Sequence, residues 1–566
     1  MDTTSHHTAP RRIVVVGGVA GGMSAAARAR RIDEHASIVV LEKSDYVSFA
    51  NCGLPYHLSG EIESRDALLL HTPATLRAAL DLDVRTGHRV TAVDRAARTV
   101  TVATADDEYA LPYDALLLAP GAVAVRPQID GIDHPAVHSL RTIPDLDALL
   151  ARLEGHEEQV DEQRRAVVVG GGFIGLEAAE ALVARGLQVD LVELAEQVLP
   201  PLDAELAVRL ADELRANGAR LHLGVAVVSI SGHDDGVVVH LSDGTALPAD
   251  DVVMNIGVRP ASNLARDAGF ELGARGAIVV DADQRTSDPH VWAVGDAVEV
   301  RHAVTGDVGP VPLAGPANRQ GRRAADSMLG RRTTPQATVL GTAIVRVFGL
   351  TAAVTGASQE TLRRAGTEHV VVRLHGGHHA GYFPGAEQVH LVASFAPDGR
   401  LLGAQGVGPD GVDKRIDVLA TALRAGMTAD DLAELELAYA PPFGSAKDPV
   451  NMLGFVAQNV LDGTMPQWQA DELDDVLTDT LVLDVRSAAE FAAGHLKGAL
   501  NIPHTELRGR LDEVRDAASG RPVSVHCASG VRSYLATRVL LAAGLDARNL
   551  SGGWLTLTAV HPHLAA

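Results

Sequence analysis

Cys52 and Cys527 are the only cysteines among the 566 residues of this chain, and both stand in contexts suited to sulfur chemistry. A deprotonated cysteine attacks other sulfur atoms, so a thiol beside groups that stabilise its thiolate is a candidate nucleophile. Two cysteines so far apart in sequence do not form a disulfide framework. Lone thiols are typical of a reducing compartment, and we therefore expect a cytoplasmic protein.

Cys52 lies in the segment SFANCGLPY, residues 48–56, where small residues and glycine surround the thiol. An enzyme that stores its oxidising equivalents in an internal disulfide needs a second cysteine a few residues away, and none is present. The oxidised form must then be a mixed disulfide with a small thiol or a sulfenic acid. Catalysis requires a thiolate, and a neighbouring helix N-terminus would lower the pKa of the thiol.

Cys527 lies in VSVHCASGVRS, between a predicted strand and a predicted helix. The loop after such a strand points successive backbone N–H groups at the sulfur. This arrangement stabilises a thiolate and then a persulfide, so Cys527 is a candidate carrier of sulfane sulfur. Phosphatase loops follow the same logic but need space for a phosphate.

The elements that must position Cys52 begin with a βαβ pattern near the N-terminus. A β-branched run at 13–16 is followed by GGVAGG at 17–22, an Ala/Arg-rich helix and the strand IVVLEK, which contains Glu42. The glycines permit a tight turn that lets a pyrophosphate approach the helix N-terminus, and Glu42 would hold ribose hydroxyls. Val19 stands where the general pattern has glycine.

A second copy of this pattern spans residues 167–193 and has the full G-x-G-x-x-G spacing at Gly170, Gly172 and Gly175. Glu193 closes its next strand, and no arginine is adjacent. An acidic residue there repels a 2′-phosphate. We therefore expect NADH to be preferred, with NADPH as the alternative.

Together with LLLAPGA (116–122) and TSDPHVWAVGDA (286–297), the two units resemble the flavoprotein disulfide reductases over about residues 11–455. The resemblance implies that the first unit binds FAD and the second NAD(H), with Asp296 at the flavin ribityl chain. An oxidised flavin is then the alternative to a helix N-terminus as the group that lowers the pKa of Cys52. The implied FAD residues are Gly17, Ala20, Gly21, Gly22, Glu42, Lys43, Ala119, Gly121 and Asp296. The implied NAD residues are Gly170, Gly172, Phe173, Ile174, Gly175, Glu193 and Gly257.

SFANCGLPY and GGVAGG are similar to the coenzyme A-disulfide reductases and the NADH-dependent persulfide reductases. This resemblance implies a coenzyme A channel, although the basic residues near Arg28 could equally form a solvated helix face. Single-cysteine NADH oxidases and peroxidases typically have a histidine where Ala20 stands, which weakens that alternative. The implied channel residues are Ser24, Arg28, Arg31, Ser48, Asn51, Asn318 and Lys447.

Residues 335–455 resemble the dimerisation domain of these reductases, and YAPPFGSAKDPVN (439–451) matches the same branch. The resemblance implies a homodimer in which Tyr439 and Tyr382 reach the partner's active site and protonate the departing thiolate. His375, His378 and His379 could suggest zinc, but no second ligand pair has metal spacing. We predict no metal there and interpret the segment as a solvated glycine-rich hairpin.

After GTMPQW (463–468) the sequence resembles a rhodanese domain over about residues 468–566. The six-membered loop from Cys527 to Arg532 favours sulfur over phosphate by this resemblance. It implies that Arg532 closes the loop and that Asp484 and Arg486 support it.

The predicted fold is α/β throughout, with two Rossmann-like dinucleotide-binding domains, an α+β dimerisation domain and a C-terminal α/β rhodanese domain. Because domains average about 150 residues, the length predicts about three or four of them. The predicted ranges are 11–118 and 254–330 for FAD, 119–253 for NAD(H), 335–455 for dimerisation, 456–467 for a linker and 468–566 for rhodanese.

The formal charge of −23 argues against nucleic acid as a partner, and no apolar run suggests a membrane span. The sequence predicts an FAD-dependent, NADH-oxidising reductase of small-thiol persulfides, polysulfide or CoA disulfide that acts through Cys52, with sulfane sulfur carried on Cys527. The alternatives are an NADH oxidase or peroxidase that cycles through a Cys52 sulfenate, and a slowly turning redox or sulfur sensor. The physiological acceptor and the direction of sulfur flow stay open.

Overall fold

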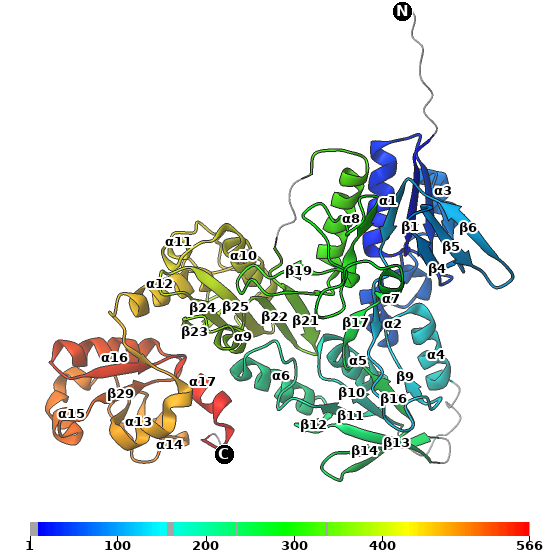
Figure 1. Ribbon diagram of the computed structural model, residues 1–566. Coiled ribbons are helices and arrows are strands. Elements are labelled where there is room, and N and C mark those ends of the chain that lie inside the picture. The colour runs from blue at the N-terminus through cyan, green and yellow to red at the C-terminus, as the bar shows by residue number, and fades with distance from the viewer. Residues whose placement is uncertain (1–9, 155–163, 234–235, 334–337, 565–566) are drawn as a thin grey trace, which may run out of the picture. The chain divides into compact units, whose positions relative to one another are not determined.

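The structure is a computed structural model that describes residues 10–154, 164–233, 236–333 and 338–564 (Figure 1). The chain forms two compact units. Unit 1 contains Met1–Leu194, Gly218–His302 and Gly306–Gly341, and unit 2 contains Ala195–Asn217, Ala303–Thr305 and Thr342–Ala566. Two predicted domain limits, residues 335 and 566, lie outside the described residues.

The first sheet of unit 1 is entirely parallel. Its strands, in spatial order, are β18 (Val291–Ala293), β7 (Ala115–Leu118), β1 (Arg12–Val16), β2 (Ser37–Leu41) and β3 (Asp83–Arg85). Four of the five residues of β1 are buried, as expected for a parallel strand covered on both faces. One face packs on α1 (Ala20–Ile32), α3 (Pro73–Leu80) and α8 (Ala314–Met328). The other packs on the antiparallel strands β4 (Arg89–Asp94), β5 (Thr99–Ala103) and β6 (Glu108–Pro112).

The second sheet of unit 1 is also parallel and repeats the strand–glycine–helix order. Its strands are β12 (Arg220–Leu223), β11 (Gln188–Glu193), β10 (Arg165–Val169), β16 (Asp251–Met254) and β9 (Val137–His138). One core cluster joins it to β13 (Val227–His233), β14 (Gly236–Leu241) and β15 (Ala246–Ala249). After β10 comes α5 (Phe173–Ala184), which contacts α2 (Leu54–Leu58), as does α4 (Ile143–Glu154). The segment that follows Cys52 therefore touches both halves of unit 1.

Unit 2 contains an antiparallel sheet in the order β21 (Ala343–Val347), β22 (Leu350–Gly356), β25 (Leu401–Gly408), β24 (Gln388–Phe395) and β23 (Val370–Gly377). Every residue of β25 is buried. Its helices are α9 (Gln359–Arg364), α10 (Val412–Ala425), α11 (Ala429–Ala433) and α12 (Pro449–Leu461). Helix α6 (Ala204–Ala216) also belongs to unit 2, although it lies within the predicted NAD(H)-binding range.

The C-terminal part of unit 2 is a parallel sheet with cores on both faces. Its strands are β26 (Gln467–Trp468), β30 (Ala547–Leu550), β29 (Val523–His526), β27 (Leu481–Asp484) and β28 (Leu500–Asn501). The helices are α13 (Leu473–Asp479), α14 (Ala488–Ala493), α15 (Leu511–Ala518), α16 (Val531–Ala542) and α17 (Gly553–Val560). Cys527 follows the central strand β29, at the carboxyl edge where α/β sheets bind ligands.

The sheets agree with the predicted fold class: unit 1 has two parallel sheets with helices, and unit 2 has an antiparallel sheet with helices and a further parallel sheet. The remaining short elements are β8 (Ala122–Ala124), β17 (Val258–Pro260), α7 (Asn263–Asp267), β19 (Val300–Arg301) and β20 (Val308–Gly309). None of the described helices is both long and apolar enough to cross a membrane.

Candidate functional site

The first glycine loop brings its backbone close enough to the strand ends that side chains are excluded. Gly17 has a φ of +106°, and a Cβ there would lie 2.1 Å from the carbonyl oxygen of Ala119. A Cβ at Gly22 would lie 1.9 Å from the carbonyl oxygen of Gly17. The backbone N–H of Gly18 donates to Oε2 of buried Glu42 at 2.8 Å. The loop and the acidic strand end are thus held together as a dinucleotide site requires.

The N-terminus of α1 presents backbone donors without a protein cap. Its N-cap, Val19, makes no side-chain hydrogen bond, and its first turn has no acidic residue. Such an end attracts phosphate. Ala20 begins the helix and Gly21 packs against Val294. Lys43 is exposed beside Glu42, and Gly121 turns with a φ of +69°.

The second glycine loop has the same construction. Gly170 has a φ of +104°, and a Cβ at Gly175 would lie 1.8 Å from the carbonyl oxygen of Gly170. The N–H of Gly171 donates to Oε2 of Glu193 at 2.6 Å. Gly172 is the N-cap of α5 and makes no side-chain cap, and Phe173 and Ile174 form a first turn without an acidic residue, which suits an anion. Gly257 turns with a φ of +106°.

The glycines of the second loop have separable roles, which predicts a contrast between two alanine variants. Gly175→Ala should lower the free energy of unfolding by about 1–3 kcal/mol, because the added methyl group meets backbone. At Gly172 a Cβ meets no atom within 4 Å. Gly172→Ala should therefore keep the unfolding midpoint yet weaken NADH binding about tenfold or more, because it intrudes on the cofactor phosphates. Urea unfolding and NADH titration measure the two effects; equal stability of both variants would contradict the assignment.

Cys52 is exposed in the short helix η1 (Asn51–Gly53), directly before α2. The N–H of Ser48 donates to the carbonyl oxygen of Gly18 at 2.8 Å, which ties this segment to the first glycine loop. Ser48 itself has a φ of +48°. The side-chain amide of Asn51 donates to the carbonyl oxygen of Arg141 at 2.7 Å. Ser48 therefore fixes the local backbone through its own N–H, and Asn51 does so through its side chain.

The protein groups around Cys52 oppose its ionisation. Partial burial, followed by the negative charges of Glu177 and Asp296, raises the pKa of the thiol. Cys52 directly precedes α2, so stabilisation of its thiolate by the N-terminus of that helix, or by an oxidised flavin, stays a prediction. Glu177 is held by the hydroxyl of Tyr56 at 3.1 Å.

Arg141 is a site residue that the sequence pattern did not reveal. Its guanidinium donates to Oδ2 of Asp296 at 3.2 Å and to the carbonyl oxygen of Ala122 at 2.9 Å. Asp296, in η3 (Gly295–Ala297), is thereby linked to Asn51. Arg141 lies outside every recognised motif, and only the folded chain brings it to the cysteine.

Four of the residues predicted for coenzyme A lie on α1 and α8, which pack together. The hydroxyl of Ser24 bonds to the side chain of Asn318. Arg28 donates to Asp326 at 2.8 Å, whereas Arg31 is exposed. Arg30 is buried against backbone carbonyls, so a fully solvated arginine face is excluded. The fifth and sixth candidates, Ser48 and Asn51, flank Cys52.

Lys447 and the two predicted tyrosines belong to unit 2. Tyr382 and Tyr439 are 76% and 48% exposed, and their hydroxyl groups are 3.0 Å apart. This hydrogen bond raises the pKa of Tyr382. Lys447 is exposed on the same motif as Tyr439. The structure therefore brings the two phenols together on the surface of one chain.

The prediction of a solvated histidine hairpin is wrong. His378 and His379 are 8% and 5% exposed and pack against each other, and His379 contacts Phe383. The Nδ1 atoms of His375 and His390 are 2.7 Å apart across neighbouring strands. Within the described residues, no group of three or more His, Cys, Asp or Glu side chains could hold a metal ion.

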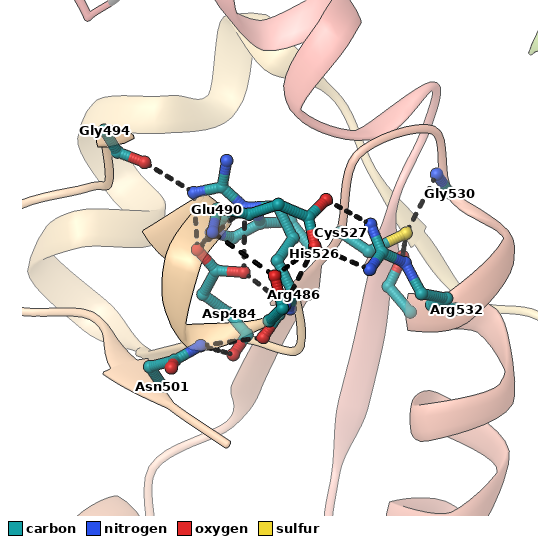
Figure 2. A network of polar contacts seen from close by, with 11 residues as sticks. Asp484, Arg486, Glu490, Gly494, Asn501, His526, Cys527, Gly530 and Arg532 are labelled. Carbon is teal, nitrogen blue, oxygen red and sulfur yellow. Dashed lines mark hydrogen bonds and ion pairs between the residues drawn. The ribbon is translucent and has the colours of Figure 1, made fainter. Parts of the chain in front are cut away.

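The sulfur of Cys527 is fully buried in a loop that aims donors at it (Figure 2). The N–H of Gly530 and the hydroxyl of Ser533 each donate to Sγ at 3.2 Å. Gly530 has a φ of +96° and is the N-cap of α16. Backbone N–H groups of Trp554 and Leu555 hold the carbonyl oxygens of Cys527 and Ala528 at 2.7 and 3.0 Å. The loop thus supplies one N–H and one hydroxyl that can stabilise a thiolate.

The predicted supporting residues lie beside this loop (Figure 2). Arg486 donates to both carboxylate oxygens of Asp484 and to the carbonyl oxygen of Gly494 at 2.6 Å. Its guanidinium lies 4.5 Å from the ring centroid of Trp554, which braces the loop. Arg532 makes a two-point ion pair with Glu490 at 2.8 and 2.6 Å. Glu490 was missed, although its S-x-x-E spacing from Ser487 signals a capping box, which the structure contains.

Burial of His526, which stacks on Trp554, predicts acid sensitivity. Neither of its ring nitrogens has a hydrogen-bond partner among the described residues, and burial lowers its pKa to about 4. The unfolded chain, with a pKa near 6.5, takes up the proton first, so stability is full above pH 6.5 and falls by about 3 kcal/mol by pH 4. His526→Phe should keep the stacking and remove this part of the loss.

The measurement is the free energy of urea unfolding of the wild type and His526→Phe between pH 7 and pH 4. Between pH 7 and pH 4, the wild type should lose about 3 kcal/mol more of its free energy of unfolding than His526→Phe loses. Parallel curves would contradict a neutral buried imidazole.

Comparison with known proteins agrees with both kinds of site. Residues 11–321 match the pyridine nucleotide-disulphide oxidoreductases, 342–449 match the dimerisation domain of that family, and 465–559 match rhodanese-like domains. The coenzyme A disulfide reductase of Staphylococcus haemolyticus (strain JCSC1435) is 35% identical over 453 residues, which cover 80% of this chain and 100% of that protein.

Two solved structures extend the similarity through the C-terminal domain. Reduced Bacillus anthracis CoADR-RHD is 41% identical with a TM-score of 0.94, covering 98% of this chain and 99% of that chain. The NAD-dependent persulfide reductase from A. fulgidus is 38% identical with a TM-score of 0.90, covering 96% and 99%. The resemblance predicted from the sequence is confirmed. The chain belongs to the pyridine nucleotide-disulphide oxidoreductase family and carries a C-terminal rhodanese-like domain.

Proposed function

We propose that this protein is an NADH-dependent reductase of coenzyme A disulfide and of small persulfides, which acts through Cys52 and carries sulfane sulfur on Cys527. The observation that carries the proposal is the pairing of two different sulfur sites in a chain with no other cysteine. The segment of Cys52 contacts the first glycine loop through Ser48, and α2, which follows it, contacts α5 after the second loop. Cys527 accepts hydrogen bonds from one backbone N–H and one hydroxyl, which suit a thiolate or persulfide.

The family's cofactors, FAD and NAD(H), fit the two glycine loops, where Glu42 and Glu193 would take the ribose hydroxyls. When both cofactors are bound, they would supply two electrons, which originate from NADH, for the reduction of a sulfur–sulfur bond. Cys52 attacks one sulfur of the disulfide, forms a mixed disulfide and releases the first thiol; reduction of the mixed disulfide releases the second. The sums are CoA–S–S–CoA + NADH + H⁺ → 2 CoA–SH + NAD⁺, and R–S–SH + NADH + H⁺ → R–SH + H₂S + NAD⁺.

The remaining site residues follow from this scheme. Ser24, Arg28, Arg31, Asn318 and Lys447 would bind coenzyme A, whose phosphates require cations on an acidic protein. Two chains would associate through the dimerisation domain, so that the exposed hydroxyl groups of Tyr382 and Tyr439 serve the partner's site and protonate a departing thiolate. The absence of other cysteines supports a cytoplasmic setting.

The test is anaerobic NADH oxidation with coenzyme A persulfide, coenzyme A disulfide and polysulfide in parallel. We expect turnover with at least one of them, with sulfide released from the persulfide and free thiol from the disulfide. Hydrogen peroxide serves as the comparison substrate. Faster turnover of peroxide than of every sulfur substrate would overturn the proposal in favour of a sulfenate cycle at Cys52.

A further inference from the structure

The guanidinium group of Arg532, which lies beside Cys527, is already paired with a carboxylate. Arg532 contacts Cys527, and both of its terminal nitrogens bind Glu490 at 2.8 and 2.6 Å (Figure 2). Glu490 is fixed in turn, because its Oε2 accepts from the N–H and hydroxyl of Ser487 at 2.9 and 2.8 Å. The hydrogen bond from Arg532 lowers the pKa of Glu490 to about 2, so the carboxylate is charged at neutral pH.

Arg486, the second arginine of this cluster, is also paired with a carboxylate. Arg486 binds both oxygens of Asp484 and lies against the ring of Trp554. Each arginine beside the loop thus has a carboxylate of its own. The two hydrogen bonds at 3.2 Å that the sulfur accepts come from neutral groups, the N–H of Gly530 and the hydroxyl of Ser533.

This charge arrangement discriminates between sulfur donors. Attack on thiosulfate expels sulfite: Cys527–S⁻ + ⁻S–SO₃⁻ → Cys527–S–S⁻ + SO₃²⁻. Thiosulfate and the departing sulfite are both dianions, and each lies beside an anionic cysteine sulfur, so this reaction needs an unpaired cation. Attack on an organic persulfide, Cys527–S⁻ + R–S–SH → Cys527–S–SH + R–S⁻, expels a thiolate of one charge. The bond between the two donor sulfurs breaks in both cases, and no external oxidant is needed.

We propose that Glu490 is a specificity residue, which selects organic persulfides over thiosulfate as the sulfur donor to Cys527 by occupying the guanidinium group of Arg532. This inference rests on the proposed function of Cys527 as a sulfur carrier and adds the class of its donor. The donor is a small thiol bearing a terminal sulfur, and inorganic sulfonate-type donors are disfavoured.

The experiment measures sulfur loading of Cys527 by intact-protein mass spectrometry in a Cys52→Ser background, where only one thiol remains. Glutathione persulfide and thiosulfate are supplied separately at equal concentration. The parent should load from glutathione persulfide at least about tenfold faster. Glu490→Gln keeps an acceptor for Ser487 but removes the charge, and it should shift the ratio of rates at least about tenfold toward thiosulfate.

Glu513→Gln is the matched control, because it removes one carboxylate that pairs with Arg510 on α15, within the same domain. It should leave the ratio at the parent value. Equal loading of the parent from both donors, or a ratio that Glu490→Gln does not change, would overturn the inference. If neither donor loads the parent, the proposed role of Cys527 itself fails. The parent's ratio decides the question even if Glu490→Gln does not fold.

Discussion

Replacing Cys52 with serine is expected to lower NADH-dependent reduction of coenzyme A disulfide and persulfide by at least about 10³-fold. A serine hydroxyl does not attack a disulfide at neutral pH and forms no mixed disulfide. The protein offers no substitute, because its other cysteine is fully buried in a loop of its own. The measurement is steady-state NADH oxidation under anaerobic conditions, with flavin content and the NADH-reduced flavin spectrum recorded for each variant.

Cys527→Ser is the matched control, since it makes the same atomic change at the only other cysteine. It should abolish sulfur loading of the rhodanese-like domain while leaving reduction of small persulfides within about twofold of the wild type. A fall in both activities in either variant would show that sulfur must pass through both cysteines. Full reductase activity of Cys52→Ser would remove that residue from the chemistry.

The raised pKa of Cys52 predicts how the reactivity of its thiol depends on pH. Burial, Glu177 and Asp296 raise the pKa in the protein, so the thiolate needs stabilisation from groups that arrive with the ligands. Glu177→Gln removes one of the opposing charges. This variant should shift the acidic limb of the pH profile of thiol alkylation at Cys52 toward lower pH, while Glu180→Gln, one turn along α5, serves as the control.

The sequence predicted those parts of the site that depend on short stretches of backbone. An added Cβ would clash with backbone atoms at four glycines of the two loops: Gly17, Gly22, Gly170 and Gly175. Only glycine fits these positions, so the residue type alone indicates the tight turn. The cradle of Cys527 was predictable for the same reason, because a strand, a loop and a helix follow one another without interruption.

The parts that escaped prediction are contacts between distant segments. Arg141 and Asp296 are separated by 155 positions in the sequence, and Arg532 and Glu490 by 42. No local sequence pattern therefore predicts either pair. The histidines on and directly after β23 show the same limit. Glycines on both sides suggested a solvated hairpin, but the fold buries His378 and His379.

The same kind of distant contact joins the rhodanese-like domain to the rest of unit 2. Arg373 on β23 donates to Oε1 of Glu205 on α6 at 2.7 Å, with both side chains almost fully buried. It also binds the side chain of Gln469 beside β26, and His375 Nε2 lies 2.9 Å from the hydroxyl of Thr556 on α17. Burial alone would raise the pKa of Glu205, but the charge of Arg373 and the hydrogen bonds that the carboxylate accepts together lower this pKa.

Arg373→Met should therefore destabilise unit 2 by about 3–5 kcal/mol, because it leaves the buried carboxylate of Glu205 without its cation. Asp203, whose pKa is raised by burial and by Glu205, adds a second acidic group to the same space. Urea unfolding followed by tryptophan fluorescence measures the loss, since Trp468 is fully buried in the rhodanese-like domain.

Two further variants separate charge from packing. Arg363→Met breaks an exposed pair with Glu360 and should change stability by less than about 1 kcal/mol. The double variant Arg373→Met/Glu205→Met removes both charges and should recover most of the loss, because a buried apolar pair replaces the ion pair at little cost. If the double variant is as unstable as Arg373→Met, shape rather than charge holds this junction, and the uncompensated carboxylate is not the cause of the instability.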